Sequence, residues 1–249
     1  MSEPKIRLYV KDNIAKSELI DIDFQQVHYL RNVMRQTAGQ QVSIFNGRDG
    51  MWRAEIVEIS RNSGVLTPVE KLIEQESVQD IWLLFSPVKR TRTDMIIEKA
   101  TELGVKEIHP ILTKYTILKR VSVDKFESTA IEAAEQSRRL SIPKIYDIKS
   151  LKDTLSVWDT NRNLYYLDFS DKSVPIAKSL LNEEKGKPCA FIIGPEGGFA
   201  PEDRELFESY DFCKPISVGP RILRAETAVI SAIACWQSIC GDWQENSFK

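Results

Sequence analysis

The sequence predicts an α/β protein of two unequal domains, and three observations support this fold class. Strand-like runs punctuated by turn residues dominate residues 1–72, whereas strands alternate with helical segments from residue 81 onwards. Between the two patterns lies a polar stretch, EQESVQD at 74–80, which is typical of a linker. We therefore expect a first domain at 1–73 and a second at 78–249.

The first domain is predicted to be small and rich in β-strands. Its strand-like runs include IRLYV at 6–10, QVSIFNG at 41–47 and MWRAEIVEIS at 51–60. The turn residues Asn46-Gly47 and Asp49-Gly50 separate the last two runs.

One helix is expected within this domain, in FQQVHYLRNVMR at 24–35. Its apolar residues recur at helical spacing and form one face: Phe24, Val27, Leu30 and Met34. Arg31 and Arg35 are four residues apart and lie on another face. The helix is therefore expected to pack by one face and to carry two arginines on another.

The second domain alternates apolar strands with helical segments. Its predicted strands are IWLLFSPV at 81–88, KEIHPIL at 106–112, NLYYLDF at 163–169, CAFIIG at 189–194 and CKPISV at 213–218. Its main predicted helices are at about 93–104, closed by Gly104, at about 124–140, from about Pro201 onwards and at about 225–240. Such alternation favours a mostly parallel sheet with helices on both faces.

Composition and charge exclude several classes of protein. Thirty-four basic and 36 acidic residues give a net charge of −2, which excludes the global positive field of an unselective nucleic-acid coat but allows local basic patches. No run approaches the roughly 18 apolar residues that span a membrane, and MSEPKIRLYV lacks a signal peptide's apolar region, so we expect a cytoplasmic protein. Four cysteines without a CxxC pair predict buried free thiols and no metal site: Cys189, Cys213, Cys235 and Cys240.

A glycine-rich turn follows one of the predicted strands, in GPEGGF at 194–199. Gly194, Gly197 and Gly198 allow the backbone to adopt positive φ and to approach a ligand closely. Because ligands of open α/β sheets bind at the carboxyl ends of strands, the turn is a candidate ligand site. It matches neither of the phosphate-binding glycine patterns, and Glu196 would repel a phosphate. A connection that binds no ligand is an equally open interpretation.

A second turn leads into an unusually apolar helix, in VGPRILRAETAVISAIACWQ at 218–237. A helix that is apolar on nearly all faces is typical of a core or of an oligomer interface. A purely structural interpretation gives these residues a capping role with a weak surface ion pair. It explains Glu226, because a negative charge is favourable at the N-terminal end of the helix dipole, but it does not explain Arg224, whose positive charge is unfavourable there. Arg224 is therefore predicted to have a function.

These two turns, together and in this order, resemble those of the SPOUT superfamily of RNA methyltransferases. More closely, the chain is similar to the ribosomal RNA small subunit methyltransferase E family, which methylates N3 of a uridine in 16S rRNA. The segments that carry the resemblance span nearly the whole chain: HYLRNVMR at 28–35, KATELGVKEIHPI at 99–111, EAAEQSRRLSIPKI at 132–145, GPEGGF at 194–199 and VGPRILRAETA at 218–228. The last two are specific as a pair.

The resemblance implies a fold and a set of partners. It implies an N-terminal PUA-like β-barrel domain that binds RNA, at 1–73, and a SPOUT methyltransferase domain with a C-terminal trefoil knot, at 78–249. The family binds S-adenosylmethionine in the knot and works as a homodimer. We therefore expect this cofactor, a second copy of the chain, and 16S rRNA or the small ribosomal subunit as partners, with no metal and no membrane.

The resemblance also assigns site residues. Those expected around the cofactor are Leu167, Gly194, Pro195, Glu196, Gly197, Gly198, Val218, Gly219, Arg221, Ile222, Leu223, Thr227 and Ala228. Arg224 and Glu226 are the expected catalytic residues. Because two like charges roughly 4 Å apart cost about 4 kcal/mol at an effective dielectric of about 20, Arg224 is expected to face the uracil or the RNA backbone rather than the sulfonium of the cofactor. Glu226 is expected to orient Arg224 or, as the second choice, to accept a proton.

Basic residues recur on both predicted domains and are the expected RNA contacts: Arg31, Arg35, Lys89, Arg90, Arg92, Arg138 and Arg139. These residues form three groups of near neighbours in the sequence, and each group alone is best explained as solvated surface. Their recurrence in a nearly neutral chain favours a cleft that binds folded RNA. The target uridine is then expected to be flipped into the site. His28 and His109 are expected to be packed or surface residues rather than catalytic ones.

One departure from the family pattern concerns a helix start, where Ala200 replaces a Ser or Thr N-cap at a cost of about 1 kcal/mol. Two other functions are considered beside the leading one. The first is an RNA-binding ribosome assembly factor without catalysis, and the intact GPEGG and GPRILRAET turns speak against it because a binding module needs neither. The second is a related enzyme that methylates a ribose 2′-hydroxyl, from which HYLRNVMR modestly discriminates.

Overall fold

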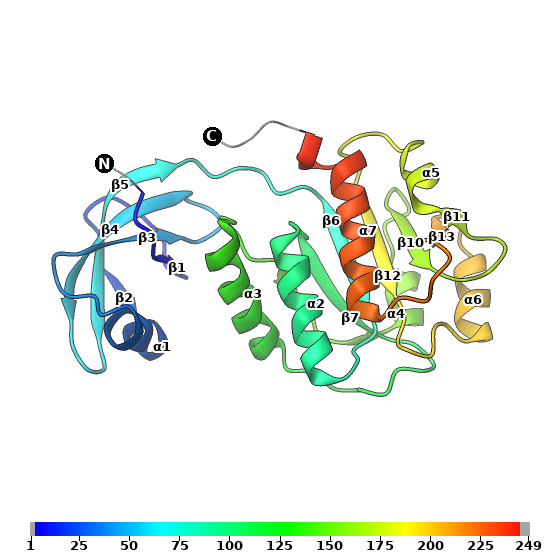
Figure 1. The fold of residues 1–249 in the computed structure, drawn as a ribbon, viewed down its shortest axis with the longest axis horizontal. Helices are drawn as coiled ribbons and strands as arrows, with labels where there is room; N and C mark the ends of the chain where they lie inside the picture. The colour runs from blue at the N-terminus through cyan, green and yellow to red at the C-terminus, as the bar shows by residue number, and fades with distance from the viewer. Residues whose placement is uncertain (1–2, 245–249) are drawn as a thin grey trace. The chain divides into compact units, whose positions relative to one another are not determined.

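The computed structural model describes residues 3–244, and the chain divides into two compact units (Figure 1). The first unit extends to Ser77 and also contains Ala134–Ile142, and the second covers Val78–Ala133 and continues from Pro143. The division after Ser77 lies within the polar stretch at 74–80. Ala134–Ile142, which linear domain boundaries place in the second domain, clusters with the first unit.

The first unit is built on a five-stranded sheet. Its strands are β1 (Arg7–Tyr9), β2 (Ile20–Ile22), β3 (Gln41–Phe45), β4 (Met51–Ile59) and β5 (Gly64–Ile73). They follow the order β1-β3-β4-β5-β2, with β1 and β3 parallel and the other pairs antiparallel. Leu8, Ile44 and Ile56 belong to the core of this unit. The β-rich first domain that the sequence predicts is confirmed.

The predicted helix at 24–35 is shorter than expected and changes its winding. α1 (Phe24–His28) passes directly into a π-helical turn at Tyr29–Val33. The predicted apolar face is buried only at its centre, with exposed fractions of 61% for Phe24, 1% for Val27, 0% for Leu30 and 37% for Met34. A π turn widens the helix, so side chains beyond it no longer follow α-helical spacing.

A buried arginine explains why Ala134–Ile142 belongs to the first unit. Arg7 is 6% exposed, and its guanidinium donates to three backbone carbonyls: Ala134 at 3.2 Å, Glu135 at 3.4 Å and Arg139 at 2.9 Å. These carbonyls lie in and just beyond the last turn of α3 (Val123–Ser137), where a helix leaves its carbonyls unpaired. Arg7 therefore satisfies acceptors that would otherwise be buried without a donor.

The second unit is built on a parallel sheet. Its strands are β6 (Ile81–Phe85), β7 (Glu107–Leu112), β8 (Lys144–Ile145), β9 (Lys149–Ser150), β10 (Asn163–Leu167), β11 (Val174–Pro175), β12 (Cys189–Ile193) and β13 (Cys213–Ser217). They follow the order β11-β13-β10-β12-β6-β7-β8, and β9 pairs with β7. All of these pairings are parallel. The predicted parallel sheet is confirmed.

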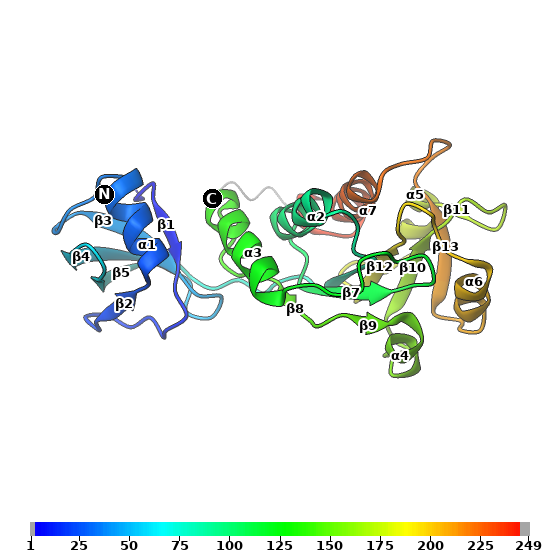
Figure 2. The same ribbon diagram turned by 90° about the horizontal axis from the view of Figure 1, so that it is seen from below.

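Helices cover both faces of this sheet. They are α2 (Arg90–Glu102), the N-terminal part of α3, α4 (Leu151–Ser156), α5 (Ile176–Leu180), α6 (Pro201–Glu208) and α7 (Ala225–Ile239), with a short 3₁₀ turn at Asp242–Gln244. Successive strand residues point to opposite faces, so Leu83 packs in the core under α2 and α7 while Leu84 packs in the core over α4 and α6. Figures 1 and 2 show α2 and α7 on one face and α4 on the other.

The apolar helix α7 is buried along one side. Its buried residues are Ala225, Glu226, Ala228, Val229, Ala232, Ile233, Trp236 and Gln237. Ile230, Ala234 and Cys235 lie on the other side and are half-buried. The helix therefore belongs to the core, as predicted, but it also leaves a partly exposed apolar side.

Candidate active site

The two glycine-containing turns meet at one edge of the parallel sheet. β12 and β13 both pair in parallel with β10, so the carboxyl ends of the three strands lie together. The turn at 194–199 follows β12, and the segment 218–224 follows β13. Leu167 ends β10 between them and packs against the same core as Val218 and Leu223. The predicted cofactor residues are thus brought to one place by the strand order.

These residues differ in exposure. Pro195 and Ala228 are buried, and Leu167, Gly194, Gly198, Val218 and Leu223 are half-buried. The exposed members of the set are Glu196, Gly197, Gly219, Arg221, Ile222 and Thr227. Ile222 is 88% exposed. The buried members of the set are therefore covered by the protein, and the exposed members are accessible to a ligand.

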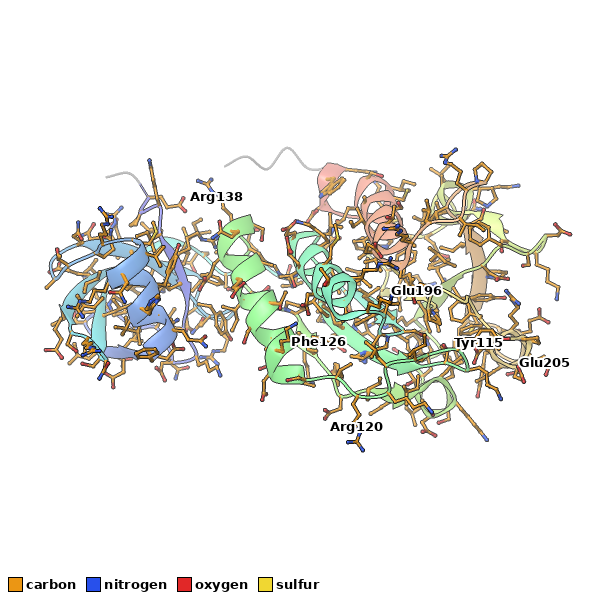
Figure 3. The ribbon with its side chains drawn as sticks, turned by 60° about the horizontal axis from the view of Figure 1, so that its bottom comes forward. Tyr115, Arg120, Phe126, Arg138, Glu196 and Glu205 are labelled. Carbon is orange, nitrogen blue, oxygen red and sulfur yellow. The ribbon has the colours of Figure 1, made fainter. Side chains whose placement is uncertain are left out.

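A local hydrogen bond and a left-handed glycine shape the turn at 194–199. The backbone N–H of Gly198 donates to the carbonyl of Pro195 at 2.8 Å, and Gly198 has a φ of 68°, a conformation that glycine adopts without strain. A Cβ at Gly194 would meet the ring of Phe199 at 3.3 Å. A Cβ at Gly197 would make an ordinary contact with Tyr115 at 3.5 Å, and Tyr115 is labelled in Figure 3.

The start of α6 compensates in part for the missing N-cap side chain. Ala200 is the N-cap residue and has no side-chain oxygen to accept a hydrogen bond. Asp203, which is 8% exposed, instead accepts the backbone N–H of Ala200 at 3.0 Å. It also accepts the backbone N–H of Lys114, at 3.3 Å, from the segment after β7. Asp203 therefore joins this segment to the helix that follows the glycine-rich turn.

The segment before α7 places Arg224 at the helix start. Gly219 has a φ of 110°, which favours glycine strongly. Arg224 is the N-cap residue, and its carbonyl accepts the backbone N–H of Ala228 at 2.8 Å. Its side chain is exposed and makes no salt bridge within residues 3–244. The guanidinium is therefore available to a ligand.

Glu226 contacts a different arginine from the one expected. It is 8% exposed, and its Oε1 lies 3.8 Å from Nε of Arg92 on α2. Nη1 of Arg92 also donates to Oε1 of Glu196, labelled in Figure 3, at 3.0 Å. Oε2 of Glu226 has no hydrogen-bond partner within the described residues. The expected contact of Glu226 with Arg224 is not formed in this structure, because Glu226 turns toward α2.

Asp168 is a residue of this edge that the sequence did not single out. It directly follows β10, is 6% exposed, and accepts hydrogen bonds from Nη2 and Nε of Arg204 at 2.9 and 3.1 Å. Burial acts to raise the pKa of Asp168, but the hydrogen bonds and charge of Arg204 outweigh it and hold the pKa below its ordinary value. The sequence feature that could have identified Asp168 is its position as an acid directly after a buried strand.

The expected RNA contacts fall in both units. Arg31, Arg35, Arg138 and Arg139 belong to the first unit, and Lys89, Arg90 and Arg92 belong to the second. Arg31, Arg35, Lys89 and Arg138 are exposed, and Arg139 is half-buried. Arg92 is occupied by two carboxylates, and the side chain of Arg90 lies outside the described part of the structure.

Neither histidine lies in the candidate site. His28 is exposed at the end of α1. His109 lies in the middle of β7, where its ring stacks on Tyr146 with centroids 4.2 Å apart and its Nε2 lies 3.1 Å from Glu107. Burial lowers the pKa of His109 to about 4, against the raising effect of Glu107. His109 is therefore a packed residue and His28 a surface residue, as the sequence predicts.

His109 is expected to make the stability of the protein depend on pH. Its folded pKa of about 4 lies below its ordinary value of 6.5, so the unfolded chain binds the proton more readily. Stability should therefore fall as pH falls from 6.5 toward 4, by up to about 1.4 kcal/mol for each pH unit. Urea unfolding at several pH values should show this slope, and His109→Gln should flatten it. An unchanged slope in the variant would contradict the assignment.

The cysteines are free thiols. Cys189 and Cys240 are buried, and Cys213 and Cys235 are half-buried. Burial raises the pKa of the Cys213 thiol to about 12. Within residues 3–244, no group of three or more His, Cys, Asp or Glu side chains is placed to hold a metal ion. None of the helices in that range is both long and apolar enough to cross a membrane.

Comparison with known protein families and relatives identifies similar sequences over nearly the whole chain. A family model described as an RNA methyltransferase domain matches residues 74–237, and one described as an RNA methyltransferase PUA domain matches residues 22–69. A ribosomal RNA small subunit methyltransferase E from Rickettsia conorii is 33% identical over 92% of this chain and 93% of its own. A protein of the same name from Buchnera aphidicola subsp. Schizaphis graminum is 32% identical over 95% of this chain and 97% of its own.

Solved structures resemble the whole fold. A putative methyltransferase from Legionella pneumophila, in complex with the bound cofactor SAM, is 27% identical with a TM-score of 0.83 and covers 94% of this chain and 97% of its own. A ribosomal RNA small subunit methyltransferase E from Neisseria gonorrhoeae, bound to S-adenosyl methionine, has a TM-score of 0.84 at 24% identity, with 96% of this chain and 99% of its own covered. At this identity, the similarity to the Neisseria gonorrhoeae structure shows a shared fold alone.

Proposed function

Because the chain belongs to the ribosomal RNA small subunit methyltransferase E family, we propose that it transfers a methyl group from S-adenosylmethionine to N3 of a uracil in 16S rRNA. The observation that carries the proposal is the meeting of the turn at 194–199 and the segment 218–224 at one edge of the parallel sheet. Such an edge is where an α/β sheet binds its ligand.

The residues at this edge fit a cationic cofactor of this kind. A Cβ at Gly198 or Gly219 would meet no atom within 4 Å, so the backbone there lies open to a ligand. The carboxylates of Glu196 and Glu226 lie on the same edge and favour a positive charge. We propose that the predicted cofactor residues, from Leu167 to Ala228, hold S-adenosylmethionine here. The cofactor would supply an electrophilic methyl group on a sulfonium.

Arg224 is proposed to act on the uracil. As N3 loses its proton, negative charge spreads onto the carbonyl oxygens of the ring and needs a donor that is already in place. Arg224 is exposed, unpaired within the described residues and anchored by its own carbonyl at the start of α7. Its guanidinium can therefore donate to the uracil without first breaking an ion pair, and like-charge repulsion disfavours a position against the sulfonium.

Glu226 is proposed to act beside Arg224 at the same helix start. Since its carboxylate faces Arg92 in this structure, orientation of Arg224 is no longer its preferred role. A carboxylate with one unpaired oxygen can accept a hydrogen bond, or the N3 proton once the uridine is bound. The helix dipole favours a negative charge at this position.

RNA binding is proposed to involve both units. The PUA-like domain at 1–73 would hold the RNA while the methyltransferase domain at 78–249 carries out the transfer. Exposed basic side chains in both units support RNA contacts in each of them, because such side chains can bind phosphates: Arg31, Arg35, Lys89 and Arg138. We propose that the uridine is flipped into the site, since specific RNA recognition favours unstacked bases.

The knot and the oligomer are further parts of the proposal. We propose that the C-terminal segment forms the family's trefoil knot, and membership of the family over nearly the whole chain supports this. We also propose a homodimer, supported by the half-buried Ile230, Ala234 and Cys235 on the outer side of α7. An rRNA substrate favours a cytoplasmic location for this enzyme.

The proposal is tested by incubating the purified protein with S-adenosylmethionine and either unmethylated 16S rRNA or small subunits, followed by mass analysis of nucleosides. N3-methyluridine is the expected product, and comparison of the two substrates identifies the preferred one. A methyl group on ribose would instead indicate the 2′-hydroxyl enzyme. Cofactor-independent RNA binding with no methylated nucleoside would indicate an assembly factor and contradict the proposal.

A further inference from the structure

One arginine contacts both the glycine-rich turn of the candidate site and the start of α7. Arg92 lies in the first turn of α2, the helix that follows β6 in the chain. Its guanidinium reaches Glu196 in the turn after β12 at 3.0 Å and Glu226 in the first turn of α7 at 3.8 Å. All three elements belong to the second unit. Arg92 therefore joins two segments that are more than twenty residues apart in the sequence.

The position of Arg92 is not explained by helix stability. A cation in the first turn of a helix opposes the helix dipole, and the first turn of α2 contains no acid to offset it. Glu226, in contrast, occupies a first turn that favours its charge. Among the described residues, the acids that compensate the unfavourable position of Arg92 are the carboxylates of Glu196 and Glu226, which belong to other elements.

The two contacts of Arg92 are expected to contribute different free energies, because Glu196 and Glu226 differ in burial. Arg92 and Glu196 have side chains that are 31% and 41% exposed, and ion pairs at such exposure contribute little. The Glu226 side chain is only 10% exposed, and among the cations whose side chains the structure describes, Arg92 alone lies within 4.0 Å of it. A buried carboxylate depends strongly on its counter-charge. Loss of Arg92 would therefore act mainly through Glu226.

The local charge also disfavours contact between Arg92 and RNA. Its one positive charge is shared by two carboxylates, so the cluster of Arg92, Glu196 and Glu226 carries a net negative charge. A phosphate approaching this cluster would be repelled. An arginine that binds phosphate usually offers free donors to it, whereas Nη1 of Arg92 donates to Glu196 and its Nε faces Glu226.

We propose that Arg92 is a positioning residue that holds the turn at 194–199 against the start of α7 and so sets the shape of the cofactor site. This role rests on the proposed function, because it concerns the same site. It replaces the RNA contact that the sequence predicts for Arg92. The other basic residues named above keep that expectation.

The test is a double-mutant cycle on cofactor binding, measured by calorimetry with S-adenosylmethionine. Arg92→Gln should weaken the Kd about tenfold, equivalent to about 1.4 kcal/mol. Arg92→Lys should restore part of the loss because it keeps the charge. In a Glu226→Gln background, Arg92→Gln should change the Kd by less than about threefold, since the partner through which it acts is already neutral. The double variant carries no unpaired buried charge and should fold.

A matched control removes another half-exposed cation from the same helix. Lys99 is 30% exposed, nearly as much as Arg92, and pairs only with Glu98 and Glu102 of α2 among the described residues. Lys99→Gln should leave the Kd within about twofold of the wild type. Melting temperatures of all variants show whether a change in Kd accompanies a loss of folding.

Two results would overturn the inference. One is an unchanged Kd in Arg92→Gln together with a higher KM for RNA and a salt slope shallower by about one, which is the signature of a phosphate contact. The other is a double variant whose Kd is weakened by the product of the factors measured for Arg92→Gln and Glu226→Gln alone. Such independence would mean that Arg92 does not act through Glu226. Absence of cofactor binding by the wild-type protein would contradict the proposed function itself, and is distinct from both.

Discussion

Arg224→Ala is expected to lower methyl transfer by roughly 100- to 1000-fold while it changes the Kd for S-adenosylmethionine by less than about threefold. The loss should be this large because a preplaced donor to a developing oxyanion acts mainly in the transition state. Cofactor binding should persist because the side chain is exposed and makes no salt bridge within residues 3–244. The helix start should also persist, since Arg224 caps α7 through its backbone carbonyl and provides no side-chain cap.

Single-turnover transfer to RNA and calorimetry of the cofactor measure the two effects separately. Lys214→Ala is the control, because Lys214 is an exposed cation on the preceding strand, β13. It should leave both quantities near wild type. If Arg224→Ala loses cofactor binding but turns over normally at saturating cofactor, Arg224 belongs to the cofactor pocket and its proposed role on the uracil is wrong.

Gly197→Val is expected to weaken the Kd for S-adenosylmethionine about 100-fold, a size typical of forcing extra methyl groups into an occupied space. The backbone at Gly197 does not require glycine, because it is not among the residues with positive φ. A Cβ there makes only an ordinary contact with Tyr115, at 3.5 Å. The folded state should therefore tolerate the substitution, and the loss should come from the space that the ligand needs.

Gly197→Ala provides a graded comparison, with an expected loss of no more than about tenfold. Calorimetry gives the two affinities, and melting temperatures within a few degrees of wild type would separate lost space from lost folding. Wild-type affinity in Gly197→Val would exclude the turn at 194–199 from the cofactor site. Replacement of Gly198 would be a poorer test, because its φ of 68° makes any side chain there strained.

Much of the second unit was predictable because its pattern is local. The strands at 81–88, 106–112, 189–194 and 213–218 each contain an observed strand, β6, β7, β12 and β13. Gly104 was expected to close a helix, and α2 ends at Glu102 with Gly104 at a φ of 85°. Runs of apolar residues and glycine stops act over a few neighbours, so they can be recognised without knowing the fold.

The short elements were not predictable by the same means. β8, β9 and β11 contain two residues each, and α5 contains five. Such segments have too few residues to show a period, and they form because a neighbouring strand or helix is already in place. The π-helical turn after α1 also escaped prediction, since the sequence at 24–35 has an ordinary α-helical spacing of apolar residues.

The sequence by itself determined the α/β class, the parallel sheet and the two turns that carry the candidate site, because each depends on residues close together in the chain. Only the tertiary structure decided that Arg7 holds Ala134–Ile142 in the first unit, that Asp168 pairs with Arg204, and that Arg92 faces carboxylates. A charged side chain has the same sequence signature whether it meets water, RNA or another residue. Its partner is fixed by which strands lie side by side, and this order follows from the packing of the whole chain.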